Sequence, residues 1–177
     1  DLFLTVEKEM EEITEKLQIV FPPECTPNLS AKQTQEFMGK IIPKFNKAKL
    51  QPFNVGSRQQ IAERLMLNGI KLTEKTEKGQ WIINEKVLDK LDTAETRLIN
   101  RYLMLQKRAA QTESWLKAVS RDGRVHGRVI TNGAITGRMT HLSPNMAQVP
   151  AVSVPFGREC RECWTVEEGN VLVGADA

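Results

Sequence analysis

The chain has 177 residues, 40% of them hydrophobic, and a net charge of +3, which together indicate one globular domain or two small ones. Its three cysteines, an odd number, do not make a disulfide framework and favour a reducing compartment. The sequence shows no secretory signal and no apolar run near the roughly 18 residues that a membrane helix needs, so we expect a cytoplasmic protein with no membrane partner.

The first 120 residues are predicted to be helical. Apolar residues recur at three- and four-residue steps over residues 2–20, which predicts an amphipathic helix with an acidic outer face, ended by Pro22-Pro23. Residues 71–80 lack apolar periodicity and predict a mobile loop. Further helices are predicted near residues 31–40, between Ser57 and Asn68, and over residues 84–91 and 93–119.

The pattern changes after Asp122-Gly123. Val125, Gly127 and Val129 alternate with polar residues, which predicts a half-buried strand, and Asn132-Gly133 indicates a turn. The apolar run over residues 171–173 is typical of a central strand. The sequence therefore predicts an α+β fold, with a helical region followed by a β-containing one.

Charge is distributed unevenly along the chain. Residues 101–140 have a local balance of +6, and residues 1–20 a balance of −4. A basic surface of this kind suits a polyanion, because lysine and arginine contacts to phosphates release condensed counterions. A solvated charged face explains the same asymmetry and stays open as an alternative.

Two stretches carry a family resemblance. Residues 126–150 join the turn Thr136-Gly137-Arg138 to a Pro-Asn-x-x-Gln-x-Pro run, and residues 171–176 end in the carboxylate of Asp176. Together they resemble the start of the palm in family A (Pol I-like) DNA polymerases, most of all in the replicative enzymes of short-tailed bacteriophages. A pattern of this length is far more specific than a lone short motif.

The resemblance extends into the helical region, although residues 24–50 match least. It implies long antiparallel thumb helices over residues 1–120 and the N-terminal part of the palm, with its first strands, over residues 121–177. The matching thumb segments are the first long helix (2–20), an Asn-x-x-Ser-Arg turn (52–58), the tip loop (73–79) and the helix that returns to the palm (101–108).

The implied activity is template-directed DNA synthesis by a DNA-directed DNA polymerase, a nucleotidyltransferase acting on primer–template DNA and deoxynucleoside triphosphates. The resemblance makes Asp176 the catalytic residue and a ligand of Mg²⁺ in a two-metal site. The second metal-binding aspartate, the fingers and most of the palm lie beyond Ala177 in this family. We therefore expect the chain alone to be inactive and a second chain or further segment to complete it, in a bacterial host if a phage encodes it.

DNA contacts are implied as well. Every correct base pair presents minor-groove acceptors in similar places, so the donors of Arg138 and the amides of Asn145 and Gln148 can test pair geometry at any sequence. Asn145 and Gln148 are also ordinary turn residues, which remains an alternative. The other expected DNA contacts are His126, Arg128, Asn132, Ser57, Arg58, Thr76, Lys78 and Lys107.

Two competing interpretations remain. Cys160-x-x-Cys163 is weak support for zinc, because a structural site needs four ligands and only distant Cys25, His126 and His141 remain. A non-enzymatic DNA-binding module or accessory clamp derived from a polymerase would keep the basic surface without the chemistry. The sequence identifies neither the host, the processivity factor, the fidelity nor an upstream exonuclease.

Overall fold

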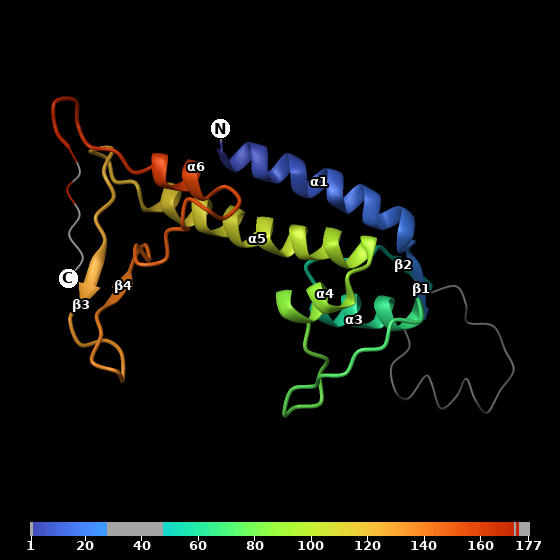
Figure 1. Cartoon of the computed structure of the whole chain (residues 1–177). Helices are drawn as coiled ribbons and strands as arrows, with labels where there is room; N and C mark the ends of the chain where they lie inside the picture. Colours follow the sequence, from blue (N-terminus) through green and yellow to red (C-terminus); the bar gives the residue numbers. More distant parts are fainter. Residues whose placement is uncertain (1, 28–47, 172, 174–177) are drawn as a thin grey trace, which may run out of the picture. The chain divides into compact units, whose positions relative to one another are not determined.

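The structure is a computed structural model that describes residues 2–27, 48–171 and 173 (Figure 1). It combines helices with short antiparallel strand pairs, β1 with β2 and β3 with β4, which confirms the mixed α+β class. In chain order the elements are α1 (Leu2–Val20), β1 (Glu24–Pro27), β2 (Ala48–Gln51), α3 (Arg58–Leu67), α4 (Glu85–Leu91), α5 (Ala94–Ala118), β3 (Arg128–Ile130), β4 (Thr140–Leu142) and α6 (Gly157–Glu162). No helix in the described ranges is both long and apolar enough to span a bilayer.

The helix predictions agree with these bounds. The helices expected over residues 2–20, between Ser57 and Asn68, and over residues 84–91 and 93–119 appear as α1, α3, α4 and α5. The helix expected near residues 31–40 lies outside the described residues. Chain contacts divide the protein into two compact units, residues 9–104 (the helical unit) and residues 1–8 with 105–177 (the hairpin unit). The thumb and palm boundary at residue 120 stays a prediction.

Local signals set the starts of two helices in the helical unit. Ser57 has extended backbone and its side chain accepts a hydrogen bond from the backbone N–H of Gln60, which caps α3. Asn84 does the same for α4, with its Oδ1 2.9 Å from the backbone nitrogen of Val87. These caps satisfy N–H groups that the first helical turn leaves without partners.

The core of the helical unit joins α1, α3, α4 and α5 to the segment around Phe53. The Phe21 and Phe53 rings lie 4.9 Å apart, and both side chains are buried. Gln18 also links α1 to the segment around Phe53, because its side-chain amide donates to the Phe53 carbonyl and accepts from the Phe53 backbone N–H. Each fully buried aliphatic side chain contributes about 1.5–3 kcal/mol. Those in this unit include Leu17, Ile61, Leu65, Ile83, Leu88 and Ile99.

The hairpin unit is organised around the second half of α5. Trp115 is buried, and the Trp164 ring, which follows α6, meets it edge-on at 5.1 Å. Two side-chain hydrogen bonds hold the segment around residues 148–150. Gln111 Nε2 donates to the carbonyl of Gln148, and Arg161 Nε donates to the carbonyl of Pro150. The segment before α6 is thus held to both α5 and α6.

Two strand predictions are wrong in detail. The half-buried strand expected over residues 125–129 is instead β3, and all three of its residues are exposed, since no second layer in the described part of the unit covers either face. Val171 and Val173, predicted in a central strand, lie outside any strand and are 81% and 87% exposed. A central strand needs partners on both sides, and within the described ranges neither valine pairs with another strand.

Candidate nucleic-acid interface

The β3–β4 hairpin presents the arginine turn that the sequence singled out. Val129 pairs with His141 and Ile130 with Thr140, and the connection between the strands carries Arg138. Ala134 donates its backbone N–H to the carbonyl of Arg138 at 3.2 Å, so the connection folds back on itself. Gly137 has φ of +76°, a backbone conformation that favours glycine. The backbone conformation of the turn therefore determines the position of the Arg138 Cα atom, from which its side chain extends.

Several basic side chains of the hairpin unit lack protein partners. The Arg138 and Arg128 side chains are exposed, and neither guanidinium makes a hydrogen bond or ion pair within the described part of the chain. Lys107, on α5, is in the same state. Arg124 is different, because its guanidinium pairs with Glu167. Exposed cations without internal partners can bind an anion without first breaking an ion pair.

Asn145 and Gln148 both serve the local fold. Asn145 Oδ1 accepts the backbone N–H of Ala147 at 3.1 Å, a turn of the kind asparagine commonly forms. The carbonyl of Gln148 accepts from Gln111 at 2.7 Å, while the Gln148 side chain is exposed. The turn-shaping alternative therefore holds for the Asn145 oxygen, but the amide N–H groups of both side chains remain able to donate outward. Asn132, in the turn after β3, is exposed.

His126 has an acidic partner four residues back. Its Nε2 lies 2.8 Å from Asp122 Oδ2, and both side chains are well exposed. This hydrogen bond, followed by one from the Arg124 backbone, holds the pKa of Asp122 below its ordinary value. The Nε2 atom of His126 is thus bonded to Asp122, whereas its Nδ1 atom is available for another partner.

The predicted phosphate contacts of the helical unit have structural roles as well. Arg58 is exposed, but its Nη1 donates to the carbonyl of Ile83 at 2.9 Å. Ser57 is the α3 cap described above, and Thr76 Oγ1 accepts from the Gln80 backbone at 3.2 Å. Lys78 is exposed, with no partner within the described ranges. Of these four side chains, Lys78 is the least committed to holding the fold.

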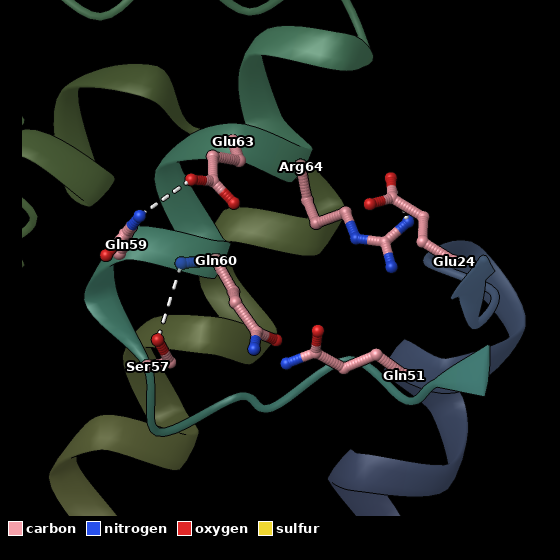
Figure 2. A pocket seen from close by; sticks show the side chains of 7 residues that line it. All are labelled: Glu24, Gln51, Ser57, Gln59, Gln60, Glu63 and Arg64. Atoms are coloured by element: carbon pink, nitrogen blue, oxygen red, sulfur yellow. Dashed lines mark hydrogen bonds and ion pairs between the residues drawn. The ribbon is translucent and has the colours of Figure 1, made fainter. Parts of the chain in front are cut away.

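A polar pocket of about 270 Å³ lies in the helical unit, and sequence reasoning did not single it out (Figure 2). Arg64 and Glu24 form an ion pair of 2.7 Å at its edge. The pocket draws on residues from separate elements, so no sequence motif signals it. Its lining side chains are Glu24, Gln51, Ser57, Gln59, Gln60, Glu63 and Arg64.

Metal ligands do not gather in the described part of the chain. No three His, Cys, Asp or Glu side chains among those residues come together as a metal site would require. Cys160 is buried, and burial raises the pKa of its thiol, whereas Cys163 is exposed and its Sγ donates to the Glu159 carbonyl. Burial of the Cys160 thiol and the hydrogen bond of Cys163 are contacts that ordinary cysteines make. Asp176, the predicted Mg²⁺ ligand, lies outside the described residues.

Comparisons with known proteins agree on one family. The family model of DNA polymerase family A matches residues 27–177. The DNA-directed DNA polymerase of Escherichia phage T7 is 41% identical over 125 residues, which cover 65% of this chain and 18% of the phage protein. A thermostable DNA polymerase I of Thermus thermophilus is 31% identical over 133 residues, 71% of this chain and 16% of that relative.

A solved structure adds the fold. The POL domain of Pol1 from M. smegmatis, in complex with DNA primer-template and dNTP, has a TM-score of 0.62 at 20% identity. The match covers 96% of this chain and 27% of the other. This chain therefore spans less than a third of the length of each of these three proteins. Because the family model covers well over half of its residues, the chain belongs to DNA polymerase family A.

Proposed function

We propose that this chain supplies the thumb and the first palm segment of a DNA-directed DNA polymerase, and that the whole enzyme performs template-directed DNA synthesis. The observation that carries the proposal is the Arg138 turn. It presents an exposed guanidinium, unpaired within the described residues, on a glycine turn inside the stretch that the family model matches. The phage relative named a DNA-directed DNA polymerase and the solved relative bound to primer–template and dNTP support DNA and nucleotide as partners.

In this proposal Arg138, Asn145 and Gln148 sense the minor groove near the primer end. Purine N3 and pyrimidine O2 accept hydrogen bonds at similar places in every correct pair. The guanidinium has five N–H donors in a rigid fork. It can therefore donate to these acceptors when the base pair has correct geometry, whatever its sequence. Arg128, His126, Asn132 and Lys107 then hold the backbone, where contacts position the duplex and carry no base information.

The catalytic part of the proposal concerns Asp176. A carboxylate oxygen is a ligand that Mg²⁺ favours, so Asp176 would hold the ion through its side chain. When bound, such an ion stabilises the charge that develops on the transferring phosphoryl group. Because the chain corresponds to 18% of its phage relative, we propose that residues outside these 177, in the remaining palm and fingers, complete the site.

DNA binding by the chain itself is the first test. The 177-residue protein should bind primer–template duplex with little sequence preference, and affinity measured by fluorescence anisotropy should fall steeply with salt. Each phosphate neutralised contributes about −0.9 to the slope of log affinity against log salt concentration. A slope near zero between low and moderate salt would contradict a backbone grip.

Arg138 is tested in the enzyme completed with the remaining palm and fingers. Arg138→Ala should slow single-turnover extension of a matched primer by roughly 5- to 150-fold, the range for loss of a good bidentate contact of about 1–3 kcal/mol. It should also shrink the penalty for a mismatched primer end. Arg158→Ala, which removes the same charge from an exposed position on α6, is the matched control. Equal effects of the two variants would remove Arg138 from the site.

Asp176 is tested in the same preparation. Asp176→Ala should abolish incorporation in Mg²⁺ while duplex affinity stays within about twofold, because that affinity comes mainly from phosphate contacts. Near-normal incorporation by the variant would exclude Asp176 as a metal ligand.

A further inference from the structure

Residues 74–82, here called the tip turn, form a hydrogen-bonded unit that overlaps the mobile loop predicted over residues 71–80. Thr76 donates its backbone N–H to the carbonyl of Gln80 at 2.8 Å, and Ile82 donates to Glu74 at 2.9 Å. Lys75 and Trp81 face each other as an antiparallel bridge pair. Gly79, with φ of +77°, allows the reversal between them. The tip turn therefore has a defined backbone on which side chains can be positioned.

One interaction across the tip turn holds a charged side chain in place. Lys75 Nζ lies 4.2 Å from the centroid of the Trp81 ring, well within the range of a cation–π contact. Trp81 is half-buried and is followed closely by Ile83, which is 1% exposed and whose carbonyl accepts from Arg58. The Trp81 side chain is thus partly covered by the protein, while Lys75 itself is exposed.

We propose that Trp81 is a positioning residue that holds the Lys75 ammonium for a phosphate of the DNA backbone. This inference rests on the proposed function and assigns a role to two residues outside the contacts considered above. A lysine side chain ordinarily loses rotamer freedom when it grips a phosphate, and that loss weakens binding. A ring that already fixes the ammonium reduces this loss. The Trp81 ring attracts the Lys75 ammonium from one side. The N–H groups of the ammonium that point away from the ring can then donate to phosphate oxygens.

The surrounding charges favour an anion at this place. Lys71 and Lys78 are exposed near Lys75 in the chain, and neither has a partner within the described ranges. Glu74, one of the two nearby acids, is paired with Lys90 at 3.3 Å, so Glu77 is the acid that opposes binding. Base stacking on Trp81 is the less favoured role, because Lys75 occupies a ring face that a base would need.

The test compares duplex affinity of the 177-residue chain and its variants at one low salt concentration. Lys75→Met should weaken binding and reduce the salt slope by about 0.9. Trp81→Leu, which keeps an apolar side chain but no ring, should weaken binding about two- to fivefold, the value of an exposed cation–π contact. Trp81→Phe should restore part of that loss. Lys86→Met, an exposed lysine on α4, is the charge-matched control and should change the affinity least.

A double-variant cycle separates positioning from structure. If Trp81 acts through Lys75, Trp81→Leu should have no further effect in the Lys75→Met background. In NMR spectra, the Lys75 ε-methylene protons should lie upfield in the wild-type chain through the Trp81 ring current, and return downfield in Trp81→Leu.

The outcomes that overturn the inference are distinct from failure of the proposed function. Equal losses from Trp81→Leu in both backgrounds would show a structural role only. Unchanged affinity of Lys75→Met, with a normal salt slope in the wild-type chain, would reject the Lys75 contact and leave the polymerase proposal intact. Absence of duplex binding by the wild-type chain would reject both.

Discussion

Arg101 and Glu9 offer a direct measurement of what joins α1 to α5 in the helical unit. Arg101 Nε lies 2.6 Å from Glu9 Oε1, and Nη2 lies 3.0 Å from Oε2, a bidentate arrangement between residues 92 positions apart. The two side chains are 36% and 31% exposed. Hydrogen bonds to charged groups contribute about 1.5–3 kcal/mol, and fully exposed ion pairs about 0.2–1 kcal/mol. Because the two side chains are only partly exposed, we expect a coupling free energy between these two ranges, about 1–1.5 kcal/mol.

The assay is a double-mutant cycle by urea unfolding with Arg101→Met, Glu9→Gln and the double variant. The sum of the two single losses should exceed the double loss by about 1–1.5 kcal/mol. The matched control is Arg97 with Asp92, whose side chains are 68% and 67% exposed and whose coupling should be smaller than that of Arg101 with Glu9, because solvent screens an exposed ion pair. If the Arg101–Glu9 coupling is no larger than that of the control pair, the reasoning from burial and bidentate geometry is refuted.

Three further predictions concern local structure. Gly133→Ala should disorder the β3–β4 connection, because an added Cβ would lie 2.0 Å from Thr140 Oγ1; loss of the hairpin cross-strand NOEs would show it. Asn84→Ala should destabilise the helical unit by about 1 kcal/mol through the lost α4 cap, measured by urea unfolding, and an unchanged midpoint would contradict the cap. Arg97→Gln should return the lowered pKa of Asp92 toward its ordinary value in an NMR titration. Because the folded pKa is the lower one, this pair stabilises the fold above the unfolded pKa of about 3.9 and loses that effect as pH falls through the folded pKa.

The sequence predicted the family of the protein, but the DNA contacts of individual residues are not yet tested. The family resemblance rested on residues 126–150 and 171–176, and the family model covers both stretches. The individual contacts assigned to Arg138, Asn145 and Gln148 remain predictions, since DNA is needed to test them. The structure adds a competing use for Asn145 Oδ1 in its own turn, which residue type alone had left open.

What the sequence determined by itself was local. Helix periods over residues 2–20 and 93–119, the Ser57 cap and the turn at Asn132-Gly133 depend on neighbours within a few positions, and the structure has each of them. The underlying signals, apolar spacing and capping side chains, act over a single helical turn. Such features can be read directly from the order of residues.

Tertiary structure decided which surfaces are covered and which distant side chains meet. An alternating pattern predicted a half-buried strand near Val129, yet β3 is exposed, because burial depends on a second layer that the pattern does not specify. The Arg101–Glu9 bond and the Arg58 bond to Ile83 join residues that no local rule connects. The Lys75–Trp81 contact arises only once the tip turn closes. Contacts of this kind follow from packing of the whole unit, so residue spacing alone cannot predict them.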